Sequence, residues 1–225
     1  MKILELAATG LEQLRTGQVS YFDWRIRREI YRILNAGYMS TPSPNHQYLA
    51  IQSAEFVMPL FTIVSEVDAL AFRLLEGAKA FSENRVADIE ELDRIQDKGY
   101  HASQWFGHND ETEERNFQSA YAGAATYKVL IEVRYDVDPW AGMERLSKSN
   151  GVFRLGSTDH TGWISSSDFT DEDWITSPFG DTAALASFAY STLPTIDEPQ
   201  PKLLYEFWEW WVKVALPNAL KVKSA

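Results

Sequence analysis

The sequence predicts an all-α, or nearly all-α, fold that forms one helical domain over residues 1–225. Hydrophobic residues make up 45% of the chain and aromatic residues 13%, which is enough apolar surface for a packed core. Apolar side chains also recur at spacings of three and four residues along most of the chain, which is the helical period. An orthogonal bundle of several helices and a short α-solenoid-like stack both satisfy this pattern, with room for one small hairpin near residues 150–165.

The first half of the chain is predicted to hold amphipathic helices separated by proline and glycine signals. In the first of them, Phe22, Ile26, Ile30 and Leu34 fall on one face. Two prolines in the segment Thr41–Asn45 predict a loop, because proline is excluded from helix interiors. The expected helices are Tyr21–Asn35, His46–Met58 with Asn45 as its N-cap, a helix from Pro59 to Leu74, and Ala87–Phe106 with Gly99 inside it.

Four arginines of the helix over Tyr21–Asn35 are predicted to lie on a solvated face that balances nearby carboxylates. Charged side chains are seldom fully buried unless they are paired. The four residues are Arg25, Arg27, Arg28 and Arg32.

Helices are also predicted in the second half, on both sides of an irregular region. Asp110 or Thr112 is expected to cap a helix that continues through Tyr127–Val137, where β-branched residues alternatively favour a strand. The helix is preferred because no turn signal precedes Tyr127. Glycine, serine and threonine then predict loops over Asp138–Asp168, with a hairpin at Val152–Leu155 and Trp163–Ile164. Helices are expected again at Asp171–Ile175 and Gly180–Ser191.

The last helix, Lys202–Leu220, is apolar around nearly its whole circumference. This pattern is typical of a helix in a protein core, so its tryptophans are interpreted as packing residues. Its narrow polar stripe contains Lys202 and Glu206, and Glu209 and Lys213, each pair spaced for an i,i+4 ion pair. Pro217 is expected to bend or end the helix.

The net charge of −11 disfavours nucleic acid and anionic membrane surfaces as partners and favours basic proteins. The chain has no cysteine, which permits a reducing compartment. The first ten residues lack the apolar run of a signal peptide, and no stretch of about 20 uncharged apolar residues occurs, so a cytoplasmic protein is expected. No phosphate-binding glycine motif is present, and no cofactor is expected.

Two residue sets offer candidate chemistry, and neither has a full catalytic pattern. Asp97, His101 and His108 have helical spacings that would align them for one metal ion, which makes a metal-dependent helical hydrolase the alternative function. They match neither the His-Glu-x-x-His nor the Glu-x-x-His pattern, so surface histidines are the plainer interpretation. Asp159 and His160 lie near serines but lack a nucleophile elbow. We therefore predict no catalytic residue and no metal ligand.

The C-terminal third resembles a known family. It contains the segment Asp181–Tyr190, a proline-rich linker, and Leu203–Ala219, which holds Phe-Trp-Glu-Trp-Trp followed by Pro-Asn-Ala. This ending resembles the fifth-numbered, all-helical immunity family of bacterial polymorphic toxin systems, and Phe56–Phe61 resembles that family's Val-Leu-Pro-Leu-Trp element. The resemblance implies a cytoplasmic antidote that binds a cognate toxin domain and has no catalytic residues of its own.

Acidic and aromatic residues occur together in the least regular part of the chain, where binding residues often lie. Many toxins of such systems are nucleases with a basic cleft, which an acidic protein would occupy with fast, steered association. The predicted partner-binding residues are Trp140, Trp163, Asp168, Asp171, Glu172, Asp173 and Trp174. Two plainer interpretations stay open: acidic residues that cap helix starts, and a scaffold protein whose charge only provides solubility.

Overall fold

The structure is a computed structural model, and only part of the chain is placed well enough to describe. The described residues are 2–63, 65–86, 88–103, 105–108, 114–135, 152–154, 163–165 and 181–222. Within them, no helix is both long enough and apolar enough to cross a bilayer.

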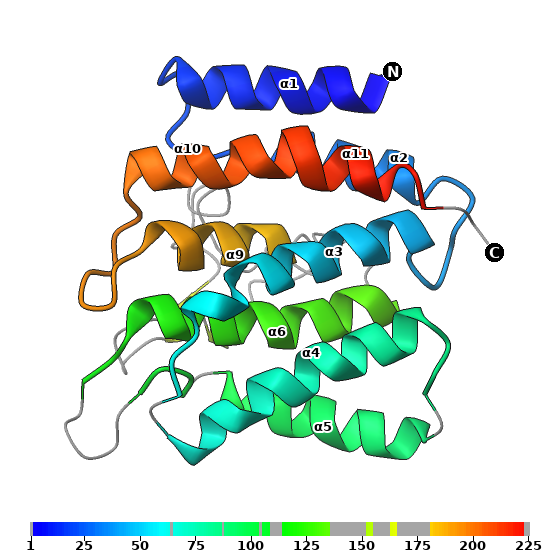
Figure 1. The fold of residues 1–225 in the computed structure, drawn as a ribbon, viewed down its shortest axis with the longest axis vertical. Coiled ribbons are helices and arrows are strands. Elements are labelled where there is room, and N and C mark those ends of the chain that lie inside the picture. Colours follow the sequence, from blue (N-terminus) through cyan, green and yellow to red (C-terminus); the bar gives the residue numbers. More distant parts are fainter. Residues whose placement is uncertain are drawn as a thin grey trace.

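The helices lie side by side and are stacked along the long axis of the molecule (Figure 1). This arrangement confirms the all-α prediction, and a layered stack describes it better than an orthogonal bundle. The helices, in chain order, are α1 (Lys2–Arg15), α2 (Trp24–Leu34), α3 (Pro44–Val57), α4 (Ala69–Ser82), α5 (Ile89–Ala102), α6 (Phe117–Tyr135), α9 (Thr182–Ser191), α10 (Pro201–Trp210) and α11 (Leu216–Ala219).

Two short strands accompany the helices. The strands β1 (Val152–Arg154) and β2 (Trp163–Ser165) pair antiparallel, and Phe153 lies opposite Ile164. They occur in the region where the sequence left room for a small hairpin.

Helix α6 lies at the centre of the stack. It packs against α3, α4, α5 and α9, and its central residues Ala122, Ala125, Val129 and Leu130 are fully buried. Helix α6 starts at Phe117, later than the predicted cap at Asp110 or Thr112, and continues through Tyr127 without a break, so the choice of a helix over a strand is confirmed for Tyr127–Tyr135.

The start of α3 differs from the prediction. Ser43, rather than Asn45, is the N-cap: its hydroxyl accepts a hydrogen bond from the backbone N–H of His46, and Pro44 takes the first helical position. Asn45 instead donates from Nδ2 to the carbonyl oxygen of Ala219, 2.8 Å away, which ties α3 to α11.

The prediction that a helix begins at Pro59 is wrong, because α4 begins at Ala69. Pro59 lies in a 3₁₀ turn, η1 (Met58–Leu60), and a second 3₁₀ turn, η2 (Glu66–Asp68), precedes α4. The carboxylate of Asp68 accepts hydrogen bonds from the backbone N–H groups of Ser65 and Gly107 and so fixes this connection.

Helix α5 is shorter than predicted and contains Gly99 without interruption. A Cβ on Gly99 would lie 2.6 Å from Leu74 Cδ2 and 2.9 Å from a ring carbon of Tyr127. Glycine is therefore required here because α4 and α6 approach α5 closely, which outweighs its low helix propensity.

The last helix runs from α10 through a π-helical turn, Trp211–Ala215, into α11. Pro217 neither ends the helix nor leaves its geometry regular. Proline lacks the N–H that would bond the carbonyl of Lys213, and its ring clashes with that carbonyl, so the helix widens before it.

The tryptophans of this helix pack in the core, as predicted. Trp208 and Trp211 are 1% and 0% exposed. The ring of Phe22 stacks on Trp208 at 4.6 Å and meets Trp211 edge-on at 6.0 Å, while Phe56 stacks on Trp210 at 3.9 Å. This aromatic core joins the last helix to α3 and to Phe22, which directly precedes the start of α2.

Candidate partner-binding surface and the buried polar network

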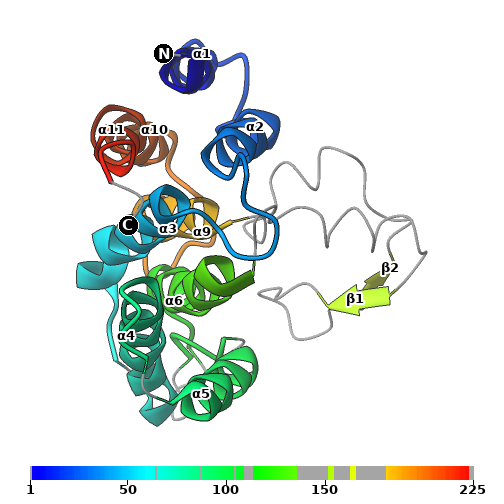
Figure 2. The same cartoon turned by 90° about the vertical axis from the view of Figure 1, so that its right-hand side faces the viewer.

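A buried polar network lies where α2, α3, α6 and α9 meet, helices that Figure 2 shows next to one another. The members of this network are fully or almost fully buried and are linked by hydrogen bonds. They are Arg27, Asn35, Ser43, His46, Glu132, Asp181 and Thr182.

Glu132, on the last turn of α6, is the centre of the network. Its Oε1 accepts a hydrogen bond from His46 Nε2 at 2.8 Å. Its Oε2 accepts two more, from the backbone N–H of Thr182 at 2.7 Å and from the Thr182 hydroxyl at 2.6 Å. Three donors therefore solvate a carboxylate that has no contact with water, which offsets much of the cost of burying it.

The hydrogen bonds around His46 determine which ring nitrogen carries the proton. The backbone N–H of Ser43 donates to Asn35 Oδ1, which turns Asn35 Nδ2 toward His46 Nδ1, 2.7 Å away. An amide NH₂ only donates, so Nδ1 accepts and the ring proton lies on Nε2, facing Glu132. Asn35 thereby orients His46, and His46 orients Glu132.

Arg27 is buried, so its prediction as a solvated residue is wrong. Its side chain is 4% exposed, and its Nε lies 2.8 Å from Oδ2 of Asp181, which is fully buried. The guanidinium also donates to the carbonyl of Phe22 at 2.9 Å and lies over the ring of Trp208 at 5.3 Å. Arg25 and Arg32 do lie on the surface, where Arg32 pairs with Glu29.

Burial and hydrogen bonding act in opposite directions on these carboxyl groups. Burial raises the pKa of Glu132, but the hydrogen bond from His46, the positive charge of Lys128 and the hydrogen bond from Thr182 together outweigh it and hold the pKa below its ordinary value. Burial raises the pKa of Asp181 against the opposing charge of Arg27, and the charge of Glu132 adds to the rise. The pKa of Tyr31 lies well above its ordinary value because of burial and these two carboxylates.

The network connects the end of α6, which precedes residue 136, to the start of α9, which follows residue 180. Glu132 lies one turn before α6 ends at Tyr135, and Thr182 begins α9. Asp181 caps α9 by accepting the backbone N–H of Ala184 at 2.7 Å. Buried hydrogen bonds therefore hold the end of α6 and the start of α9 together.

Most of the predicted partner-binding residues fall outside the described part of the chain. Trp140, Asp168, Asp171, Glu172, Asp173 and Trp174 lie outside the described residues. Trp163 begins β2. The assignment of these seven residues to partner binding therefore stays a prediction. Asp159 and His160 also lie outside the described residues.

The predicted metal-ligand set is not brought together. Among the described residues, which include Asp97, His101 and His108, no three His, Asp or Glu side chains are placed to share a metal ion. The ring of His101 meets Tyr100 edge-on at 5.3 Å, and His108 meets Trp105 at 5.6 Å. The two histidines thus make ordinary aromatic contacts, His101 in the last turn of α5 and His108 in the connection that follows it.

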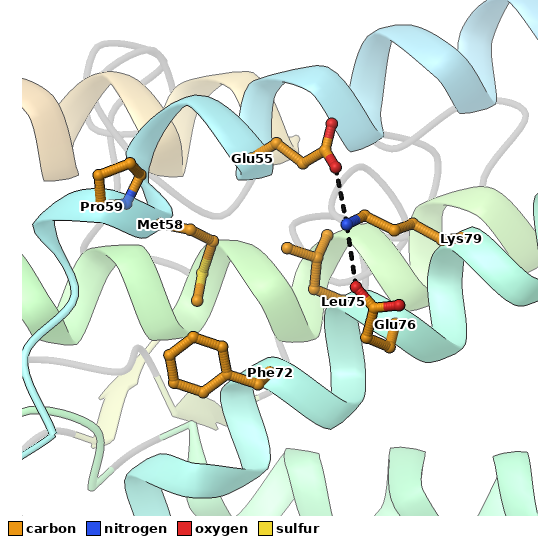
Figure 3. Close-up of a pocket in the computed structure, with 7 residues that line it drawn as sticks. All are labelled: Glu55, Met58, Pro59, Phe72, Leu75, Glu76 and Lys79. Atoms are coloured by element: carbon orange, nitrogen blue, oxygen red, sulfur yellow. Dashed lines mark hydrogen bonds and ion pairs between the residues drawn. The ribbon is translucent and has the colours of Figure 1, made fainter.

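Two shallow grooves flank α4. The α3–α4 groove, about 420 Å³ in volume, is lined by Glu55, Met58, Pro59, Phe72, Leu75, Glu76 and Lys79 (Figure 3). The α4–α5 groove, about 470 Å³, is lined by Glu66, Val67, Ala69, Leu70, Arg73, Lys98, His101, Ala102 and Trp105. Sequence reasoning missed both grooves and the buried network, because both depend on which helices pack together.

No protein-family model matches the chain, and no curated protein matches it.

Proposed function

We propose that this chain is an immunity protein, a cytoplasmic antidote that binds and neutralises a cognate bacterial toxin domain with a basic, nuclease-like active site. It acts by binding and performs no catalysis of its own. The resemblance of its last helix to an immunity family suggests this class, and the buried tryptophans of that helix are consistent with its role as a core element.

The distribution of charge carries the proposal. Residues 136–180 contain eight acidic and three basic side chains, so about half of the net charge of −11 falls in one fifth of the chain. Three of the eight tryptophans, Trp140, Trp163 and Trp174, occur in the same segment. Carboxylates with aromatic anchors are the composition expected of a surface that binds a basic protein.

The buried network supports the proposal because it holds the two helix ends that flank residues 136–180. A binding segment is effective when its ends are fixed, because less conformational entropy is lost on association. Glu132 binds Thr182, and Asp181 binds Arg27, through bonds of 2.6–2.8 Å, so the helix ends that flank residues 136–180 are fixed to the core.

The decisive experiment uses the toxin domain encoded directly upstream of this gene, because an antidote gene is expected to lie directly downstream of its toxin gene. Purified wild-type protein should form a stoichiometric complex with that domain and abolish its activity. Charge reversal of Asp171, Glu172 and Asp173 together should weaken the complex. A toxin domain that remains fully active with excess wild-type protein, or turnover of a substrate by the purified protein alone, would refute the proposal.

A further inference from the structure

Helix α4 lines two grooves that have similar volumes and differ in the charge of their lining residues. Phe72, Leu75, Glu76 and Lys79 share one helical face and line the α3–α4 groove. A neighbouring side of α4 contributes Ala69, Leu70 and Arg73 to the α4–α5 groove. The two grooves therefore provide an internal comparison on one rigid element.

The α3–α4 groove offers an apolar slot. Leu75 is only 5% exposed and forms its floor, whereas Phe72 is 43% exposed. Met58 points toward the Phe72 ring in Figure 3, with Pro59 at the end of the slot. The ring of Phe72 also rests edge-on against Phe61 at 5.8 Å, which holds it in place. A volume of about 420 Å³ accommodates one or two side chains of a partner.

The rim of this slot carries an excess of negative charge. Lys79 Nζ lies 2.7 Å from Glu55 and 2.9 Å from Glu76, so one ammonium serves two carboxylates (Figure 3). Burial acts to lower the pKa of Lys79, but hydrogen bonds to both glutamates outweigh it and raise the pKa, so Lys79 stays charged. The triad retains one uncompensated negative charge, and the Glu76 side chain is 68% exposed.

The α4–α5 groove has a different rim. Its exposed aromatic residue, Trp105, is comparable to Phe72 at 47% exposure. Its polar lining contains Arg73, Lys98 and His101 against the single acidic residue Glu66. Arg73 already pairs with Glu91 at 2.8 Å. With Arg73 paired, Lys98 and Glu66 balance each other, so a cationic partner finds no excess negative charge in this groove, in contrast to the α3–α4 groove.

We propose that the α3–α4 groove is a docking site for the basic partner, which inserts an apolar side chain against Phe72 and places a neighbouring lysine or arginine on Glu76. This inference rests on the proposed function and names a contact surface outside residues 136–180. The partner cation would gain the free oxygen of Glu76 and the face of the exposed Phe72 ring.

The test compares two matched double variants for binding to the toxin domain encoded beside this gene. Phe72→Ala with Glu76→Lys alters the α3–α4 groove, and Trp105→Ala with Glu66→Lys alters the α4–α5 groove. Each pair removes one half-exposed ring and changes the net charge equally, so long-range electrostatics are matched. We expect the first pair to weaken binding by about tenfold or more and the second by less than about threefold.

A further variant, Glu76→Lys alone, guards against a folding defect, because this exposed side chain can be changed without disturbing the core. It should weaken binding more than Glu66→Lys alone, with melting temperatures that stay equal. Equal affinities for the two charge variants would overturn this inference and leave the proposed function standing. Absence of binding by the wild-type protein would overturn both.

Discussion

The aromatic and the polar regions of the interior are stabilised in different ways. Around Trp208 and Trp211, stability comes from apolar area, which tolerates small changes of shape. Around Glu132 and His46, every buried donor and acceptor must keep its partner, because an unpaired buried group costs more than a pair contributes. Arg27 joins the two regions, since it lies over Trp208 and pairs with Asp181. The aromatic region therefore holds α10 and its neighbours together, whereas the polar region holds the end of α6 against the start of α9.

The largest expected effect comes from truncation at the centre of the network. Glu132→Ala leaves His46 Nε2 and the N–H and hydroxyl of Thr182 without their acceptor in a buried site. We expect a loss of about 3–5 kcal/mol in the free energy of unfolding. Chemical denaturation measures it, and a loss below about 1 kcal/mol would contradict the assignment of Glu132 as the centre of the network.

The next effect isolates the charge of Glu132. Because its pKa is lowered in the folded protein, its ionised form stabilises the fold above the unfolded value of about 4.3, and this stability is lost as pH falls through the folded pKa. Glu132→Gln keeps the shape and removes the charge. The stability difference between wild type and this variant should be constant near neutral pH and shrink below about pH 4. A stability difference that grows on acidification would contradict a lowered pKa of Glu132 in the folded protein.

The smallest effect is expected in the aromatic region. Among the described residues, the Trp211 indole N–H is buried with no hydrogen-bond partner. Trp211→Phe removes this unpaired group together with some packing volume, so the loss should be only about 1–2 kcal/mol. Thermal unfolding compares it with Glu132→Gln at neutral pH. The comparison between the two regions fails if the tryptophan change is the more destabilising of the two.

The sequence predicted the aromatic region better than the polar one, for a physical reason. The apolar circumference of the last helix placed its tryptophans in the core, and its two predicted ion pairs occur, at 3.8 Å for Lys202–Glu206 and 2.6 Å for Glu209–Lys213. Such patterns are local, because they repeat within one helix.

The polar network has no local pattern. The bond between His46 and Glu132 joins residues 86 positions apart, and Arg27 meets Asp181 across 154 positions. Arg27 therefore looked like the surface residues Arg25 and Arg32 of the same helix. One local signal was available: Asp181 directly before an apolar helix is a typical N-cap, and a buried cap predicts a buried partner.

The most direct test of the central claim is the salt dependence of binding to the neighbouring toxin domain. An acidic protein that recognises a basic one should associate more slowly as salt screens the attraction, since the Debye length falls from about 10 Å at 0.1 M to about 3 Å at 1 M. We predict that the association rate constant drops by about tenfold or more over this range while the dissociation rate changes little. An association rate that does not depend on salt would contradict the claim that surplus negative charge brings the two proteins together.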